Sequence, residues 1–305
     1  MVVAASHVKS DAAIRFLSQF ATHPAIEVRS QLLWAWSRFE CAAYAEDVIS
    51  KLDPLDLRYS IRSDEQLRQL ERLRPRPSSL DVRSEVSLPA LAGYAGRHGL
   101  TELILAHPTV PDLDFLKGQS ALQQLALDNC PELTDLCALG GLPIRRLGVR
   151  SVRPDVGLDV VAGLGELEQL ALSGPAGMTW SPQALPTRAP LVVLLVSGAM
   201  APAAGLKGLG AVSGLTHLGL NVASSPASEA DWREIGELRS LHHLTVSAAS
   251  FAFLPPAATL PSVADLTLIG YGEDRCMSTA IDRLDAVFPR LDRWNTGEAW
   301  DFSAE

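Results

Sequence analysis

The hydrophobic residues of this chain follow a spacing that suits neither a plain helix nor a plain strand. In residues 120–142, SALQQLALDNCPELTDLCALGGL, leucine stands at positions 122, 125, 127, 133, 136, 139 and 142. The core of this pattern, LxxLxL, recurs eleven times at intervals of 22 to 28 residues, with occasional substitutions. Its second leucine position falls at 55, 80, 103, 125, 147, 170, 194, 218, 244, 266 and 294. The pattern therefore predicts a repeated structural unit.

Strand geometry gives a physical reason for the spacing. In LxL, the two apolar side chains point to one face of a strand and the middle residue points to the other. The segment between two such strands is long enough to return and start the next strand in parallel, and its own apolar residues close the core. The sequence thus predicts an α/β fold, a curved parallel sheet in a leucine-rich-repeat solenoid of about eleven irregular repeats.

The repeats differ from one another between the strands. Leucine-rich repeats usually place Asn or Cys three residues after LxL, and Cys130 matches this, whereas the other repeats place there residues such as Pro108, Val152 and Ala199. The segments 228–241 and 278–288 have helical apolar spacing. Residues 173–190, SGPAGMTWSPQALPTRAP, support only turns and short 3₁₀ pieces.

The first 50 residues lack the repeat and predict three short helices, two of which start near Asp11 and Ala42. The second helix places apolar side chains on one face, namely Val28, Leu32, Leu33 and Trp36. The stretch HPAIEVRSQLLWAW is similar to the second helix of HEAT-type repeats. We therefore expect two domains, a helical HEAT-like cap over residues 1–50 and a leucine-rich-repeat domain over residues 51–305.

Composition narrows the classes of partner. A net charge of -9 disfavours nucleic acid and anionic membrane surfaces as partners. The chain has no 18-residue apolar stretch, and its start, MVVAASHVKSDAA, lacks the features of a signal peptide, so we expect a cytoplasmic protein. The cysteines, at positions 41, 130, 137 and 276, form no CxxC pair, which favours buried apolar roles over a metal site or disulfides.

Ligand-contacting side chains of such a sheet stand on its open, concave face. We name the positions directly before the second leucine the first open column, and those directly after it the second open column. The residues that we predict to contact a ligand are Ile104, Gln124, Arg146, Gln169, Val193, Leu195, His217, His243 and Asp265. Small residues in the second open column, including Ala126, Gly148 and Ala171, leave room for a ligand to approach.

Two features of the open face allow more than one interpretation. His217, His243 and Asp265 share the first open column in three successive repeats, so they are a possible metal site, a set of solvated polar side chains or a set of partner contacts. Val193 and Leu195 form an exposed apolar patch, which either contacts a ligand or packs against another domain. Asp128 and Arg150, one strand apart, predict a cross-strand ion pair of small energetic value.

The sequence contains no pattern typical of a catalytic site. A GxSxG elbow, an HExxH pair and a phosphate-binding GxxxxGK[ST] loop are all missing. The glycine-rich stretch GLKGLGAVSGL is better interpreted as a repeat turn, with core positions at Leu206, Leu209, Val212 and Leu215. We therefore predict neither enzymatic activity nor a cofactor.

The helical block and the irregular repeats together resemble a known family. The stretch HPAIEVRSQLLWAWSRFECAAYAEDVISKLDPLDL, followed by DEQLRQLERL and LTELIL, looks like the C-terminal sensor region of bacterial NACHT-type STAND NTPases, relatives of animal NOD-like receptors. In that family the repeats perceive a ligand, an upstream ATPase switches state, and several members act in defence against bacteriophage. The resemblance implies a non-enzymatic sensor that binds a protein ligand, such as a phage-derived one, or the NTPase module of a longer parent protein. A constitutive protein-protein scaffold is the alternative. A metal-dependent enzyme that uses His217, His243 and Asp265 is a third hypothesis.

Overall fold

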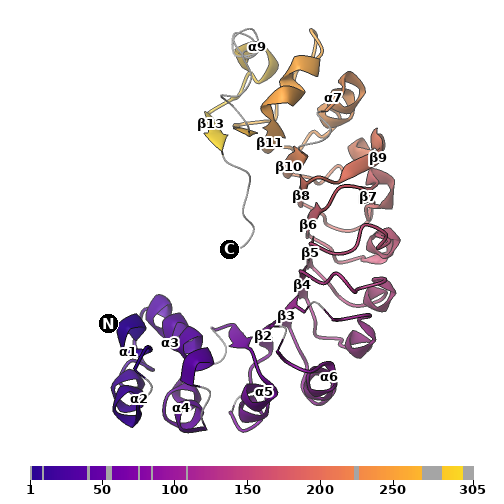
Figure 1. Ribbon diagram of the computed structural model, residues 1–305. Coiled ribbons are helices and arrows are strands. Elements are labelled where there is room, and N and C mark those ends of the chain that lie inside the picture. The colour runs from indigo at the N-terminus through magenta and orange to yellow at the C-terminus, as the bar shows by residue number, and fades with distance from the viewer. Residues whose placement is uncertain are drawn as a thin grey trace.

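The computed structural model describes residues 2–8, 10–39, 42–52, 57–74, 76–83, 85–107, 109–222, 227–269 and 284–297. The protein is an arc, and over the part that contains the sheet the strands line the inner, concave side while the connecting helices and 3₁₀ turns lie on the outer, convex side (Figure 1). All paired strands in the described residues are parallel. The predicted α/β class and the parallel, solenoid-like sheet are therefore confirmed.

The described residues place eleven strands in the main sheet, and each pairs with the next one in the following order. The strands are β1 (Tyr59–Ile61), β2 (Ser79–Arg83), β3 (Glu102–Ala106), β4 (Gln124–Asp128), β5 (Arg146–Arg150), β6 (Gln169–Gly174), β8 (Val193–Gly198), β10 (His217–Val222), β11 (His243–Ser247), β12 (Asp265–Ile269) and β13 (Arg293–Gly297).

From β2 onwards the strands pair in the register that LxxLxL predicts. Leu80 lies opposite Leu103, and the series continues through positions 125, 147, 170, 194, 218, 244 and 266 to Trp294. From β2 to β12 the residues at these positions, and those two places later, are buried. Trp294, on the last strand described, is 45% exposed.

The first repeat is an exception to the predicted register. We predicted its strand at residues 52–57, of which 53–56 lie outside the described residues, but β1 spans Tyr59–Ile61 and pairs Tyr59 with Leu80. The alternation of buried side chains falls on Leu57, Tyr59 and Ile61. Leu52 directly follows the 3₁₀ turn η1 (Ile49–Lys51) and is buried there, so it does not start a strand.

Helices and 3₁₀ turns connect the strands. The helices are α5 (Asp64–Leu70), α6 (Leu88–Arg97), α7 (Glu229–Gly236) and α9 (Leu284–Val287), and the turns are η3 (Asp114–Leu116), η4 (Cys137–Leu139), η5 (Asp159–Gly163), η6 (Pro182–Ala184), η7 (Leu209–Ala211) and η8 (Ala248–Phe253). Serine side chains cap α5, α6 and α7 by accepting a backbone N–H of the first turn. The helix predicted in 228–241 is confirmed by α7, whereas 278–283 of the other predicted helix lie outside the described residues.

The segment 173–190 contains more structure than its composition predicts. Besides η6, it forms β7 (Thr179–Trp180), which pairs in parallel with β9 (Ala201–Leu206) in a second, two-stranded sheet. Met178 and Trp180 are buried, so packing of these side chains stabilises a short strand that turn-forming residues alone do not indicate.

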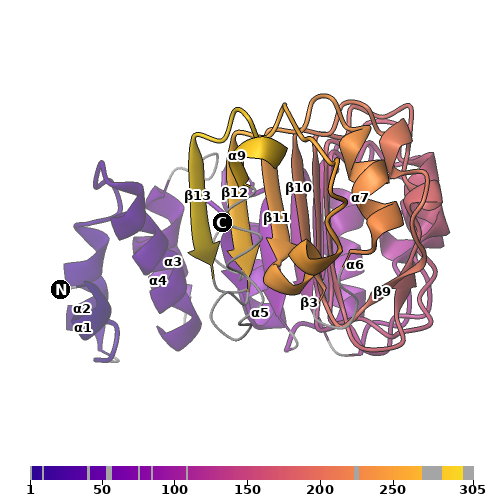
Figure 2. The ribbon, with the colours of Figure 1, turned by 90° about the horizontal axis from the view of Figure 1, so that it is seen from above.

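Four α-helices precede the sheet within the described residues, where we predicted three: α1 (Val2–Ala5), α2 (Asp11–Ser18), α3 (Ile26–Phe39) and α4 (Ala42–Asp47). The predicted starts at Asp11 and Ala42 are confirmed, and the unpredicted α1 is only one turn long. Leu32, Leu33 and Trp36 of α3 are buried, and α3 packs beside β1. Figures 1 and 2 show these helices and β13 as the two ends of the arc, on the same side of the molecule.

The hydrophobic core is continuous from the N-terminal helices through the sheet. The four core positions predicted in the glycine-rich stretch, Leu206, Leu209, Val212 and Leu215, are buried. Of the cysteines, Cys130 is buried, whereas Cys137 is exposed because Ala138 and Leu139 of η4 turn inward instead, so the prediction of a buried role is wrong for Cys137. Cys41 and Cys276 lie outside the described residues. None of the helices in the described ranges has the length and hydrophobicity needed to cross a membrane.

Candidate functional site

The concave face carries a groove of about 530 Å³ that runs across the strands from β2 to β8. Six of the nine residues that we predicted to contact a ligand line it, namely Ile104, Gln124, Arg146, Gln169, Val193 and Leu195. The remaining three, His217, His243 and Asp265, lie beyond it on β10, β11 and β12. The structure therefore divides the predicted site into two regions.

The floor of the groove is made by small side chains of the second open column. Ala126, Gly148 and Ala171 lie next to one another on β4, β5 and β6. A methyl group added at Gly148 would meet Ala126 Cβ at 3.5 Å, an ordinary contact, so no larger side chain occupies this space. Ile104 on β3 and Leu195 on β8 border the floor on its two sides.

The apolar patch on β8 alternates as the sequence predicts. Leu194 and Val196 are buried in the core, whereas Val193 and Leu195 are half-buried on the concave face. Leu195 also covers the neighbouring strand, because a Cβ at Gly219 of β10 would lie only 2.8 Å from Leu195 Cδ2. The groove therefore ends where Leu195 fills the space above Gly219.

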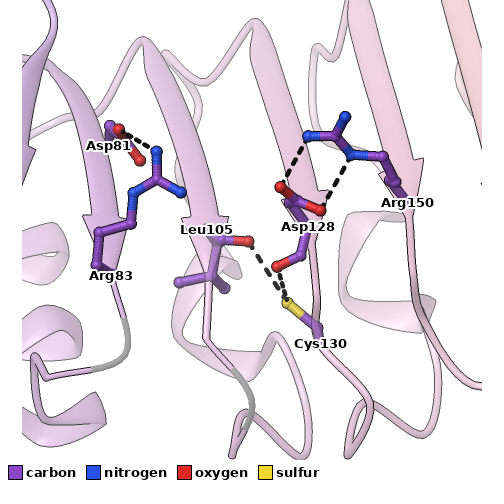
Figure 3. A network of polar contacts seen from close by, with 6 residues as sticks. All are labelled: Asp81, Arg83, Leu105, Asp128, Cys130 and Arg150. Carbon is purple, nitrogen blue, oxygen red and sulfur yellow. Dashed lines mark hydrogen bonds and ion pairs between the residues drawn. The ribbon is translucent and has the colours of Figure 1, made fainter. Parts of the chain in front are cut away.

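Three ion pairs of described residues lie on the concave face within the groove. Arg150 donates to both carboxylate oxygens of Asp128, with distances of 3.0 Å from Nε and 2.8 Å from the terminal nitrogen, which confirms the predicted cross-strand pair (Figure 3). Arg83 donates to Asp81 Oδ2 at 2.8 Å on β2 (Figure 3). Arg58 and Glu102 form a third pair.

Sequence reasoning missed part of this charged lining. Arg58, Asp81 and Arg83 line the groove but were not among the predicted contacts. The incorrect register of the first repeat hid Arg58, which directly precedes the true β1. Asp81 occupies the second open column of β2, so the repeat pattern itself could have identified it.

Below the groove, Cys130 lies at the turn that follows β4. Its thiol is 3.4 Å from the carbonyl oxygen of Leu105 and 3.6 Å from that of Asp128 (Figure 3). Burial raises the pKa of this thiol, which disfavours the reactive thiolate. Cys130 therefore joins two neighbouring strands as a weak donor, and it offers no nucleophile to the groove.

The second region is a row of side chains that contact one another. The rings of His217 and His243 stack with centroids 4.0 Å apart and planes 10° apart. His243 Nδ1 lies 3.0 Å from Asp265 Oδ2, and Arg293 Nε donates to Asp265 Oδ1 at 2.6 Å. We call these four residues, His217, His243, Asp265 and Arg293, the histidine row.

Two pKa shifts follow from this packing. Partial burial is the main cause that lowers the pKa of His217, and the neighbouring His243 lowers it further. The hydrogen bonds from Arg293 lower the pKa of Asp265. Parallel stacked rings do not direct two nitrogens toward one point, and the described residues contain no group of three His, Cys, Asp or Glu side chains arranged to hold a metal ion.

A comparison of the chain with protein-family models gives no match, and a comparison with curated proteins gives none either.

Proposed function

We propose that this chain is a non-enzymatic recognition module whose concave groove binds a protein ligand. The observation that carries the proposal is the groove itself, an open trough with a floor of small side chains, an apolar border and charged side chains along its length. This combination of apolar surface with a few directional polar groups is typical of binding sites. The proposal includes no cofactor and no nucleic-acid partner, because most charges in the groove are paired and the whole chain is acidic.

We further propose that the strands form a leucine-rich-repeat domain and that the N-terminal helices act as a HEAT-like cap. The in-register buried leucines and the packing of α3 beside β1 support this assignment. The motif resemblance then favours a cytoplasmic sensor region of a bacterial NACHT-type STAND receptor in antiphage defence. A constitutive protein-protein scaffold is the alternative, and an upstream P-loop ATPase encoded in the same reading frame would favour the sensor.

The metal-dependent function is the third alternative, and the histidine row gives it little support. Asp265 already interacts with His243 and Arg293, so binding a metal would break those contacts. Metal analysis of the purified protein tests this alternative directly.

A pair of leucine substitutions tests recognition through the groove. Gly148→Leu should fill the groove floor, whereas Gly163→Leu adds the same side chain at an exposed return turn, where a new Cβ meets nothing within 4 Å. Both proteins would be used as bait in the cells that encode the chain, with and without phage infection. Partners that bind wild type and Gly163→Leu but are lost with Gly148→Leu would support the proposal. If every partner survives Gly148→Leu in a folded protein, recognition does not use the groove.

A further inference from the structure

Most charged side chains of the groove form ion pairs with one another, and among the described residues one arginine does not. The described lining contains four arginines and three carboxylates. Arg58 pairs with Glu102, Arg83 with Asp81 and Arg150 with Asp128. Arg146, on β5, is exposed and forms no ion pair among the residues that the structure describes. The groove thus has one surplus positive charge in a chain whose net charge is -9.

The residues next to Arg146 can assist in binding an anion. Gln124 on β4 and Gln169 on β6 flank it in the first open column, and neighbouring strands lie about 4.8 Å apart. A guanidinium binds a carboxylate through two parallel hydrogen bonds, and each flanking side-chain amide can donate one more. A carboxylate, with one negative charge, matches the surplus of one, whereas the three resident carboxylates would repel a more highly charged phosphate group.

An apolar subsite lies beside this cation. The floor residues Ala126, Gly148 and Ala171 are in the second open column, two residues along the strands and therefore about 7 Å from the level of Arg146. Ile104 and Leu195 border that floor. The two subsites together fit a carboxylate and an apolar side chain that are neighbours on one ligand.

The position of Arg146 along the groove indicates which carboxylate it binds. β5 has lining strands on both sides, with β3 and β4 before it and β6 and β8 after it. A segment that lies along the groove therefore continues past Arg146 in both directions. Such a segment presents an internal side chain at this point, and a chain terminus would leave half of the groove empty.

We propose that Arg146 determines the specificity of the groove by binding an Asp or Glu side chain within an extended protein segment, while an adjacent apolar side chain of that segment lies on Ala126, Gly148 and Ala171. This inference rests on the proposed function, because it specifies the ligand of the same groove. It identifies the ligand class as an acidic-apolar segment of a protein.

The test is a selection of linear peptides from a random displayed library on the folded wild-type chain, followed by affinity measurements with synthetic peptides. We expect selected peptides to carry an internal Asp or Glu next to an apolar residue. Replacing that acid by its amide should weaken binding about 10-fold or more, as expected for loss of a charge-assisted bidentate contact. Amidating the peptide C-terminus should change the affinity less than about 2-fold, and a dependence on the free C-terminus would overturn the proposal.

Two neighbouring arginines provide matched variants. Arg146→Gln should abolish the preference for acid over amide, Arg146→Lys should restore part of it, and Arg146→Glu should select basic peptides instead. Arg145→Gln is the control, because Arg145 is also exposed but pairs with Glu168 and does not line the groove. Its peptide affinities should stay within about 2-fold of wild type, and thermal melts should show that all four variants are folded.

The same peptides distinguish failure of this inference from failure of the proposed function. If binding is lost with Gly148→Leu but the acid preference survives Arg146→Gln, the groove binds proteins and the role of Arg146 is wrong. If Gly148→Leu weakens the binding of none of the selected peptides, the proposed function fails, and this inference fails with it.

Discussion

The groove and the histidine row occupy the same open columns of one sheet, yet they differ in how many of their side chains bind or stack on one another. Over β4 to β6 the second open column consists of alanine and glycine, and Arg146 forms no ion pair with any residue that the structure describes. Over β10 to β13 the rings of His217 and His243 stack, and Asp265 holds both His243 and Arg293. The same backbone geometry therefore gives either an open binding surface or a surface whose side chains contact one another. The outcome depends on the size of the side chains and on which charges stand on neighbouring strands.

Leu195 marks the border between the two regions. Its side chain leans from β8 over Gly219 of β10, so the glycine gives no open space there. Gly148 has no such neighbour, because only Ala126 approaches its Cβ position. Two glycines in one column therefore have opposite effects on the surface.

The largest predicted effect tests the register on which the comparison depends. Leu194→Ala should lower the free energy of unfolding by about 2–5 kcal/mol, because Leu194 is fully buried and the change leaves a cavity. Leu195→Glu should cost about 1 kcal/mol or less, since its new charge can stay hydrated on the concave face. Urea denaturation of both proteins measures the difference. Equal destabilisation by the two variants would mean that the concave face is wrongly assigned.

The next prediction compares the two glycines. Gly148→Ala should stabilise the protein by roughly 0.5–1 kcal/mol, because alanine restricts the unfolded chain and its methyl group fits beside Ala126. Gly219→Ala should gain nothing or lose stability, because Leu195 must rotate away from the new methyl group. Thermal melts of both variants test this. A gain at Gly219 equal to that at Gly148 would show that Leu195 does not close the groove.

A pH titration tests how strongly the histidine row is self-paired. The folded-state pKa of His217 is lowered, so the unfolded chain takes up the proton more readily, and stability should fall as the pH drops below the ordinary histidine value of about 6.5. His217→Gln should remove this part of the loss. The difference in melting temperature, variant minus wild type, should therefore increase as the pH falls from 7 to 5.

The titration window separates His217 from its charged neighbours. The lowered pKa of Asp265 acts in the same direction but only at pH values below about 4, outside this window. His217 is the one histidine that differs between the two proteins, so the comparison isolates its ring. If the melting temperatures of wild type and His217→Gln differ by the same amount at every pH from 7 to 5, partial burial of the ring does not lower the pKa of His217.

The sequence predicted the strands well because their spacing is set by burial. Leu125, Leu147 and Leu170 must all face one core, and a shift of one residue would expose them, so the pattern alone determines their register. At β1 the same rule failed, because Leu52 is buried directly after the 3₁₀ turn η1 and so matches the first leucine of a repeat without starting a strand. A local pattern does not tell whether a buried leucine enters the core from a strand or from a turn.

The sequence predicts which residues of the candidate site lie on the open face, but not which of them pair with one another. Alternation identified Arg146, Leu195 and His217 as open-face residues, and all three are on that face. It could not predict which arginine remains unpaired, since pairing depends on the reach of side chains across strands. Nor could it predict the stacking of His217 on His243, which depends on rotamers.

The smallest predicted change in stability is the one that alters the groove most directly. Asp128→Asn should cost less than about 1 kcal/mol, because the Asp128–Arg150 pair is partly exposed and such pairs contribute little. The same change removes one negative charge from the groove and replaces the carboxylate that accepts from Arg150 by a neutral amide. An acidic peptide selected on wild type should therefore bind the variant more tightly, most clearly at low salt, where charge interactions are least screened.

Calorimetric titration of one acidic peptide into wild type and Asp128→Asn at two salt concentrations measures this effect. Asp155→Asn is the control, because Asp155 pairs with Arg153 at an exposed turn outside the groove and its removal changes the net charge by the same amount. An equal gain in affinity for both variants would assign the effect to net charge alone. A gain confined to Asp128→Asn would instead locate the bound acid in the groove, near enough to β4 and β5 to be repelled by Asp128 in the wild-type protein.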